Sequence, residues 1–428
     1  MGKKLIKNSI FVTMDDAHPI VSGCLAWDDD TITYIGERLP EGQFDEVIDG
    51  SHRLFMPGLV NTHGHAAMSL LRGYADDLAL KVWLEEKMWP IENKFTDEDV
   101  RIGAKLSILE MLKSGTTCFV DMYDHMNEVA LAVEQSGIRA SLARGMIGFP
   151  PEAQTAKLKE ATQFAKDWNG KADGRITTMM SPHSPYTCPP DFIRRIVETA
   201  QTLNLPVHTH MSETSEEVER NVCDYGKRPV AHLRDLGMFD VPCLVAHAVH
   251  LTDEEIGILA EHKVHVSHNP GSNLKLASGV ARVMDMMRAG ILLSLGTDSA
   301  ASNNDLDMFG EIQLTALIHK GVSGDPTAVK AYDALKMGTI NGARSLWLDR
   351  VGMLRAGMKA DFIGIDIDQP HFYPRTDFIS HLVYSASGRD VADVCIDGKW
   401  IVRNREVLTM DEEKIMREFA ACFARLTK

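Results

Sequence analysis

Two histidines stand at the end of an apolar run, and their spacing suggests a metal site. The run begins at Phe55 and leads into His63 and His65. In an extended segment, residues two apart point to the same face, so both imidazoles can reach one ion. Imidazole is a good ligand for zinc and iron. Alone the pair is a weak signal, since neighbouring histidines mostly have solvated or structural roles.

The signal gains weight because polar, mostly titratable side chains recur at the end of every predicted apolar strand. They are His63, His65, Asp121, Arg144, His183, His210, His247, His268 and Asp298. A buried histidine with a satisfied hydrogen bond is the ordinary explanation for any one of them. Folding alone is a poor explanation for the whole set.

A second pair of histidines has the same spacing as the first. Only one of His208 and His210 needs to face an ion, and Glu213 lies just beyond the predicted strand end. A carboxylate at that place can shuttle protons for a water molecule that a metal activates. Asp298 could complete a site of three histidines and one carboxylate, with one position left open for water. The other acidic residues up to Glu219 suit a solvated helix start.

The elements that position these residues alternate between short apolar strands and amphipathic helices, which predicts a parallel sheet with crossover helices. We count eight strands, at residues 54–60, 117–122, 139–144, 176–180, 206–210, 243–247, 264–268 and 292–296. Eight strands close a (β/α)8 TIM-like barrel, whose active sites lie at the carboxyl ends of the strands. A doubly wound sheet is the alternative, but it would want a Gly-x-Gly-x-x-Gly turn after its first strand, and none is present.

Both ends of the chain carry short strand signals instead of this alternation. They cover residues 5–49 in the first part, and residues 391–402 around the hairpin turn Asp397-Gly398 in the last. Each piece is too small to bury a core alone. We therefore predict one discontinuous small β-sandwich domain from residues 1–54 and 351–428, beside a barrel of residues 55–350.

Composition favours a small-molecule substrate. With 45 basic and 60 acidic residues the formal charge is −15, which argues against nucleic acid or an anionic membrane as a partner. Apolar runs are far shorter than the ~20 residues of a membrane helix. Seven scattered cysteines without a Cys-x-x-Cys pair fit reduced thiols and rule out the Pro-Cys-x-x-Cys zinc site of cytidine deaminases. We expect a cytoplasmic homo-oligomer whose metal ligands are histidine and carboxylate.

Several of these motifs resemble the amidohydrolase superfamily. They are residues 57–65 (Pro-Gly-Leu-Val-Asn-Thr-His-Gly-His), His210 with Glu213, Val245-Ala246-His247, residues 267–270 (Ser-His-Asn-Pro) and Gly296-Thr297-Asp298. The resemblance spans nearly the whole chain. It is closest to the 5-methylthioadenosine/S-adenosylhomocysteine deaminases, through residues 89–92, 182–186 and 299–304. It implies a metal-dependent hydrolase that converts the adenine ring of these nucleosides, or of adenosine, to hypoxanthine with release of ammonia.

The same resemblance implies the metal site. One divalent ion, zinc or alternatively iron, would be held by His63, His65, His210 and Asp298. The binuclear branch of the superfamily has a carboxylated lysine at the end of the fourth strand. Residues 179–183 contain no lysine, which favours a single metal.

The resemblance also implies which residues meet the substrate: Glu92 at the ribose hydroxyls, Arg144 and His183 on the nucleoside, and Glu213 and Asp298 at the reacting ring. Glu213 would protonate ring nitrogen 1, while His247 and Asp298 would orient the water and relay its proton to the departing ammonia. Some relatives carry a second arginine soon after Arg144. Residues 145–164 contain none, so a strong grip on an amino-acid carboxylate is not expected.

Two other functions stay open. A related enzyme that acts on guanine, cytosine or a chlorotriazine would keep the metal site but would not need Glu92 near the pocket mouth. A metal-free structural protein would show degenerate ligands, whereas all four positions are present. The preferred nucleoside, the native metal and the roles of His208, His250 and His268 are not assigned by the sequence.

Overall fold

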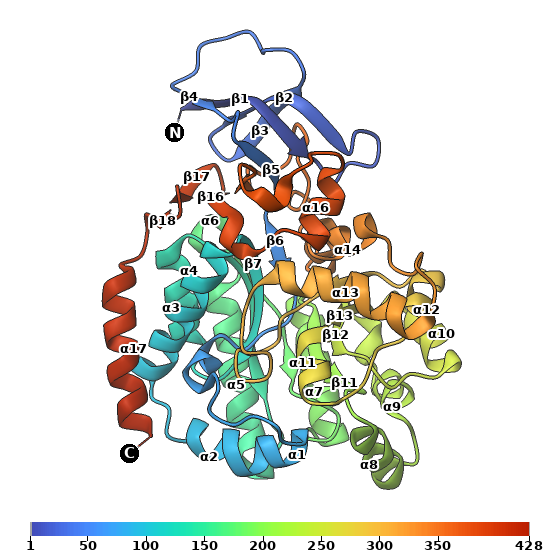
Figure 1. Ribbon diagram of the computed structural model, residues 1–428. Coiled ribbons are helices and arrows are strands. Elements are labelled where there is room, and N and C mark those ends of the chain that lie inside the picture. The colour runs from blue at the N-terminus through green and yellow to red at the C-terminus, as the bar shows by residue number, and fades with distance from the viewer. Residues whose placement is uncertain (1, 428) are drawn as a thin grey trace.

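The computed structural model describes residues 2–427 and combines a barrel with a sheet made by both ends of the chain. Figure 1 shows this sheet beyond one end of the barrel, with the C-terminal helix α17 (Glu412–Leu426) running alongside α3 (Asp97–Lys113). None of the helices within residues 2–427 is long and apolar enough to cross a membrane.

The barrel strands pair in parallel, in two runs. The strands are β6 (Leu59–Asn61), β7 (Thr116–Tyr123), β8 (Arg139–Met146), β9 (Ile176–Thr178), β10 (Ser181–Pro182), β11 (Val207–Met211), β12 (Cys243–His247), β13 (His265–His268) and β14 (Leu293–Leu295). A parallel bridge between Met180 and Val207 joins the runs. The Thr62 N–H donates to the Leu295 carbonyl at 2.9 Å, between the first strand and the last. These contacts complete the (β/α)8 barrel that the sequence predicts.

Two predicted strands are interrupted. The fourth stops at Thr178 and resumes as β10, and both halves pair with β8. The prediction of one strand over residues 54–60 is wrong, because β5 (Arg53–Pro57) pairs with β1 and β15 of the terminal sheet, and β6 begins the barrel. The break falls at Gly58, where an added Cβ would lie 2.0 Å from the Thr117 hydroxyl oxygen. A glycine allows this close approach.

Helices follow the barrel strands in the chain. They are α3, α4 (Met126–Ser136), α5 (Gln154–Trp168), α7 (Pro190–Leu203), α8 (Ser215–Tyr225), α9 (Pro229–Asp235), α10 (Asp253–Glu261), α11 (Pro270–Lys275), α12 (Val283–Arg288), α13 (Met308–Ser323), α14 (Ala331–Met337) and α15 (Ile340–Ser345). Helix α3 begins at a capping box of Thr96 and Asp99. The short helices α1 (Leu80–Val82), α2 (Trp89–Glu92) and α6 (Lys171–Gly174) lie in connections.

The terminal sheet has nine strands, from both ends of the chain. They are β1 (Lys3–Val12), β2 (Ile20–Asp28), β3 (Thr31–Gly36), β4 (Glu46–Asp49), β5, β15 (Phe362–Asp366), β16 (Val391–Ile396), β17 (Lys399–Arg403) and β18 (Glu406–Val407). Trp27 on β2 has its ring centroid 5.2 Å from that of Phe362 and 5.8 Å from that of Trp400 on β17. Strands β2 and β17 are not neighbours in the sheet order. The sheet therefore curls over its own core, as a sandwich does.

The predicted hairpin is confirmed, with β16 and β17 joined by Asp397 and Gly398. Both turn residues have positive φ, 47° and 70°, the backbone of a type I′ turn. The turn also contacts the barrel, since Asp397 lies 2.7 Å from the guanidinium of Arg139 at the start of β8. The same guanidinium pairs with Asp361 at 2.8 Å.

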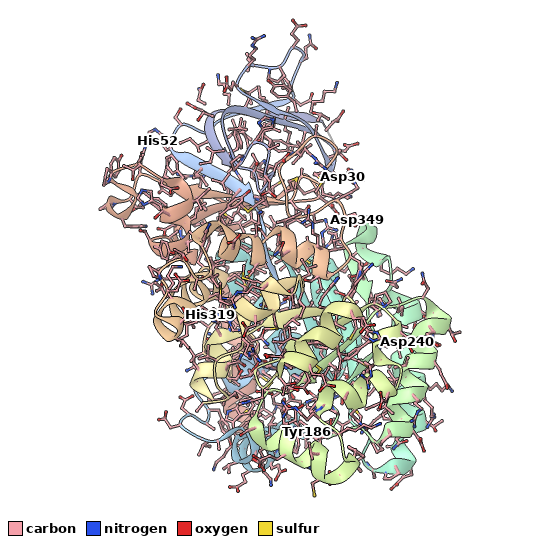
Figure 2. All side chains as sticks on the ribbon, turned by 90° about the vertical axis from the view of Figure 1, so that its right-hand side faces the viewer. Asp30, His52, Tyr186, Asp240, His319 and Asp349 are labelled. Atoms are coloured by element: carbon pink, nitrogen blue, oxygen red, sulfur yellow. The ribbon has the colours of Figure 1, made fainter. Side chains whose placement is uncertain are left out.

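The terminal sheet lies at the end of the barrel away from Tyr186. Figure 2 shows Asp30 and His52 of the sheet at one end of the molecule and Tyr186 at the other. The predicted borders of the two domains stay a prediction. Strand β5 belongs to the terminal sheet by its pairing, and α17 contacts α3 through the ion pair of Lys113 and Glu412 at 2.7 Å.

Candidate active site

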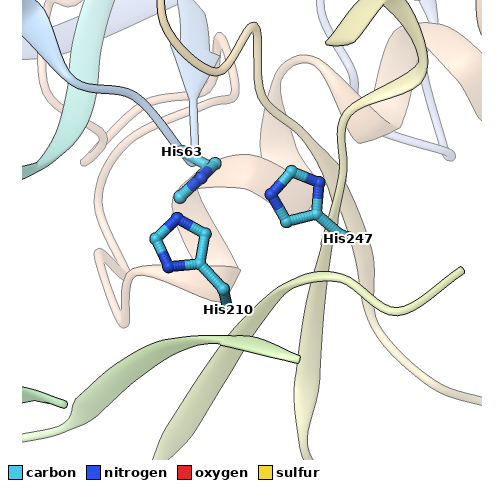
Figure 3. Close-up of side chains that lie close together, drawn as sticks. All are labelled: His63, His210 and His247. Carbon is cyan, nitrogen blue, oxygen red and sulfur yellow. The ribbon is translucent and has the colours of Figure 1, made fainter. Parts of the chain in front are cut away.

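Four side chains converge at the carboxyl ends of the barrel strands. The Asp298 Oδ1 atom lies 3.6 Å from His63 Nε2 and 3.3 Å from His65 Nε2, and the Nε2 atoms of His65 and His210 are 3.3 Å apart. The structure thus brings together the four residues that the sequence analysis proposes as metal ligands. Figure 3 shows His63, from the turn behind β6, with His210 of β11 and His247 of β12, three imidazoles around one space.

The hydrogen bonds of these histidines leave the right atoms free for a metal. The Nδ1 atom of His65 lies 2.7 Å from the Met122 carbonyl, and that of His210 lies 2.6 Å from the His183 carbonyl. A carbonyl only accepts, so Nδ1 carries the proton and the lone pair is on Nε2. The buried Nε2 of His63 has no hydrogen-bond partner among residues 2–427. Three such nitrogens and a carboxylate oxygen suit zinc or iron.

The electrostatics of the cluster favour neutral imidazoles. Burial, reinforced by the neighbouring histidines, holds the pKa of His63 and of His210 well below the ordinary value. A metal ligand must be deprotonated at its donor atom. These two rings therefore meet that requirement without first losing a proton at neutral pH.

The backbone at the strand ends is adapted to this cluster. Strand β6 stops at Asn61, so His63 and His65 stand on the turn behind it and not on the extended strand that the sequence suggests. An added Cβ at Gly296 would lie 2.7 Å from the backbone nitrogen of His63. His247 and Asp298 have φ of 75° and 61°, a left-handed conformation that is costly for residues other than glycine.

Hydrogen bonds fix the Asp298 carboxylate. Its Oδ2 accepts from the hydroxyl of Ser272 at 2.7 Å and from that of Ser302 at 3.0 Å, while Oδ1 accepts from the backbone N–H of Ser299 at 2.8 Å. Oδ1 is also the oxygen nearest the histidines. The carboxylate is thus held with one oxygen turned toward the metal position.

Glu213 and His247 lie beside the cluster. Glu213 Oε2 is 3.8 Å from His247 Nε2, and the Nδ1 of His247 lies 2.8 Å from the Asn273 side-chain oxygen. That bond places the proton of His247 on Nδ1 and leaves Nε2 to accept another. Burial, with the nearby Asp298 charge, raises the pKa of Glu213 to about 8. A carboxyl group of that pKa can act as an acid near neutral pH.

Glu217 is a residue whose role the sequence analysis missed. Its carboxylate accepts from the backbone N–H groups of Ser212 and Glu213, each at 2.8 Å, and burial raises its pKa to about 7. The expectation of a solvated helix start therefore fails at this position. Glu217 is four residues from Glu213, one helical turn, and this spacing was the available signal.

A cavity of about 570 Å³ opens above the cluster. Glu92 and His183 both line it. The Tyr123 hydroxyl donates to Glu92, and burial raises the pKa of Glu92. The Nδ1 of His183 lies 3.0 Å from the Thr187 hydroxyl oxygen, and burial lowers the pKa of His183 to about 3. The cavity therefore presents a neutral imidazole and a carboxyl group to a ligand.

Arg144 also lines the cavity, but its charge is already engaged. It pairs with Asp124 at 2.9 Å and with Glu160 at 3.1 Å. Lys157 on α5 stands beside it and donates to the carbonyls of residues 147 and 149. The sequence analysis missed Lys157, because a lysine on an amphipathic helix is expected to be solvated.

His268 and His250, whose roles the sequence does not assign, lie away from the metal position. His268 has its Nε2 3.2 Å from that of His319 on α13, and His250 has its Nε2 2.7 Å from the Ser278 carbonyl. Asp121, another strand-end residue, accepts from the Ala66 N–H at 3.2 Å. None of His268, His250 and Asp121 lines the cavity.

Comparison with known sequences points to one family. Residues 54–401 match the model of the amidohydrolase family. A 5-methylthioadenosine/S-adenosylhomocysteine deaminase of Moorella thermoacetica is 49% identical over 100% of this chain and 99% of its own. The protein of the same name from Dictyoglomus thermophilum is 50% identical over 91% of each chain.

Solved structures agree in fold. An adenosine deaminase from Xanthomonas campestris with bound zinc has a TM-score of 0.93 at 34% identity, covering 99% of this chain and 98% of its own. An atrazine chlorohydrolase from Arthrobacter aurescens complexed with zinc has a TM-score of 0.91 at 22% identity, covering 98% and 100%. At that identity the second likeness shows the fold alone.

Proposed function

The chain belongs to the amidohydrolase family, and from this premise we propose that it hydrolyses the 6-amino group of the adenine ring of a nucleoside. The substrates are 5′-methylthioadenosine and S-adenosylhomocysteine, the compounds in the names of its relatives. The products are the hypoxanthine nucleoside and ammonia. The observation that carries the proposal is one cavity lined by members of the histidine cluster, by Glu213 and by Glu92.

In this proposal His63, His65, His210 and Asp298 would hold one zinc ion, with iron(II) as the alternative. When bound, the ion supplies a Lewis acid that makes a water molecule nucleophilic near neutral pH. The convergence of three imidazole nitrogens and one oriented carboxylate oxygen supports this assignment. No lysine stands at residues 179–183 to bridge a second metal.

Glu213 serves as the acid at the ring. Attack at carbon 6 places electrons on ring nitrogen 1, and a proton delivered there stabilises the tetrahedral species. The raised pKa of Glu213, about 8, means that it carries a proton at neutral pH. The carboxylate of Glu217 accepts a hydrogen bond from the backbone N–H of Glu213. This bond fixes the backbone there and so holds the Glu213 carboxyl group in one orientation.

His247 and Asp298 orient the attacking water and take its proton. Nε2 of His247 faces the cluster with its lone pair, since Nδ1 is bound to Asn273. The proton then passes to the departing amino group, which leaves as ammonia. As the carbonyl forms at carbon 6, its hydroxyl proton returns to Glu213. A general base within hydrogen-bond reach of the water contributes typically 10²–10⁴-fold to the rate.

Glu92, His183 and Arg144 bind the rest of the nucleoside. Glu92 accepts hydrogen bonds from the two ribose hydroxyls, and neutral His183 contacts the purine. Arg144 lines the same cavity, and we assign it to the substituent on the 5′ sulfur, which differs between the two substrates. Because Asp124 and Glu160 already pair with Arg144, an added carboxylate gains little, and we expect activity on both compounds.

The test is ammonia release from a small panel, namely methylthioadenosine, adenosylhomocysteine, adenosine, guanine and a chlorotriazine. We expect release from the first two, together with about one zinc or iron per chain by elemental analysis. Activity on guanine or the chlorotriazine alone would refute the proposed substrates. A cytoplasmic location and a homo-oligomeric assembly stay predictions, which fractionation and light scattering can check.

A further inference from the structure

His208 is a buried imidazole that the proposed reaction does not use. It lies on β11 two residues before His210, and both side chains point into the barrel, with His208 deeper. Its exposed fraction is 0%, and it does not line the cavity. It therefore cannot meet the substrate, and its partners must explain it.

Those partners form a chain that ends at the metal cluster. His208 Nδ1 lies 2.9 Å from the Leu244 carbonyl oxygen, and His208 Nε2 lies 3.0 Å from His63 Nδ1. The carbonyl accepts only, so His208 donates from Nδ1. A fully buried cation with no carboxylate partner would be costly, so His208 is neutral and its Nε2 is an acceptor. His63 must then donate from Nδ1.

This fixes the tautomer of His63 with the lone pair on Nε2. That Nε2 atom is the one that lies 3.6 Å from Asp298 and has no hydrogen-bond partner among the described residues. The other two histidines of the cluster obtain the same tautomer from backbone carbonyls, at Met122 and His183. His63 differs from them because the acceptor of its Nδ1 proton is a side chain, that of His208.

We propose that His208 is a positioning residue for the metal site: it accepts the Nδ1 proton of His63 and is itself held by the Leu244 carbonyl. The inference rests on the metal site of the proposed function but not on the identity of the substrate. Without an acceptor at this place, His63 can turn or carry its proton on Nε2, and the ion loses a ligand. Partners of this kind typically change metal affinity by 10- to 100-fold.

Two substitutions separate the bond to His63 from the bond to Leu244. The amide of a glutamine reaches about as far as Nε2 of a histidine, so His208→Gln keeps an acceptor for His63. The amide of an asparagine reaches only as far as Nδ1, so His208→Asn keeps a donor for Leu244 and loses His63. Both variants place one neutral amide in the same buried position, which makes them a matched pair.

The measurement is zinc affinity of the purified holoenzymes by competition with a chelator, with the folded fraction checked by circular dichroism. We expect His208→Asn to bind zinc 10- to 100-fold more weakly than the parent, and His208→Gln to stay within about fivefold of it. His232→Phe is the control for losing a buried imidazole, since His232 stacks on Tyr225 away from the cluster. It should bind zinc as the parent does.

Equal zinc affinity in the Asn and Gln variants, whether strong or weak, would overturn the proposal, because the acceptor for His63 is what distinguishes them. Zinc affinity needs no substrate, so failure here is separate from failure of the deaminase assignment. If the panel of nucleosides gives no ammonia but the Asn variant still loses zinc, the positioning role stands and the substrate is wrong.

Discussion

At the scale of single residues, the acid at the ring is the most sensitive position. We predict that Glu213→Gln retains its metal but loses kcat by a factor of about a hundred or more, because an amide cannot deliver the proton. Steady-state kinetics with metal analysis measures both. Glu219→Gln, on the exposed side of α8, is the matched control and should leave kcat unchanged. Near-normal turnover of Glu213→Gln would remove this residue from the mechanism.

Arg144 is the residue that we expect to distinguish the two substrates, although only weakly. We predict that Arg144→Ala lowers kcat/KM for adenosylhomocysteine more than for methylthioadenosine, by at most about fivefold, since an ion pair of this kind contributes ~0 to 1 kcal/mol. The measure is the ratio of the two efficiencies in the variant and in the parent. An equal fall for both substrates would mean that Arg144 supports the common nucleoside or the barrel. Arg194→Ala, on α7, is the control.

Residue types and spacing were enough to single out side chains that converge in the structure, but not their hydrogen-bond partners. His63, His65, His210 and Asp298 could be found because each follows a predicted strand. Glu217 was missed although its spacing from Glu213 was a signal, because acidic residues at a helix start are expected to be solvated and this one is buried. Hydrogen bonds between distant segments leave no periodic pattern in a sequence.

At the scale of elements, the seam between β6 and β14, where the Thr62 N–H donates to the Leu295 carbonyl, supports the metal site. We predict that Gly296→Ala weakens zinc binding, because the added methyl group would lie 2.7 Å from the His63 nitrogen and push that segment aside. Gly310→Ala on α13 meets nothing within 4 Å and should leave zinc binding unchanged. Chelator competition compares the two. Unaltered zinc affinity in Gly296→Ala would show that the seam adjusts without moving His63.

The contact of α17 with α3 depends on an ionised carboxylate. Burial would raise the pKa of Asp99, but its bonds with Arg425, Cys422 and Thr96 outweigh this and hold it at about 2. A lowered pKa means that stability is complete above about pH 4 and is lost as pH falls toward 2. We predict that Asp99→Asn costs about 1.5–3 kcal/mol at neutral pH, as for hydrogen bonds to charged groups.

Unfolding by urea at several pH values tests this prediction. The difference between the parent and Asp99→Asn should shrink as the pH is lowered from 4 to 2, and Glu98→Gln, exposed in the same helical turn, should show no such difference. A gap that stays constant over this range would exclude the charge of Asp99 as its source.

Element boundaries were predicted well where the apolar run was isolated, and poorly where two strands were continuous in sequence. Strand β12 covers the predicted residues 243–247. We predicted residues 54–60 as one strand because the whole run suits burial. The run is divided at Gly58, where Thr117 approaches the backbone closely. Such a contact between distant segments depends on the tertiary structure and cannot be predicted from local periodicity.

At the scale of the whole molecule, a buried ion network ties the terminal sheet to the barrel. Arg139 at the start of β8 pairs with Asp361 and Asp397. We predict that Asp361→Asn lowers the free energy of unfolding by about 3 kcal/mol, since removing one partner leaves a buried charge less compensated. Urea denaturation measures this. Asp349→Asn, at an exposed position, should change it by less than about 0.5 kcal/mol.

The union of both chain ends could be predicted from the sequence, because neither piece can bury a core alone. Its form could not. The packing of Trp27 on Trp400 requires the sheet to curl, and sheet curvature depends on pairing over the full length of the chain. Pattern within one strand says nothing about which strand lies across the core.

The curled sheet also sets an order of events during synthesis. Strands β1–β5 leave the ribosome before the barrel, yet Phe362 and Trp400, which cover Trp27, are made only after it. At ~5–20 residues per second this delay is on the order of tens of seconds. Throughout it, one side of β5 is an unpaired edge and Trp27 lacks its contacts with Phe362 and Trp400, which exposes the nascent chain to misassociation. Strands β1–β5 are thus made before the barrel but reach their final packing only after it.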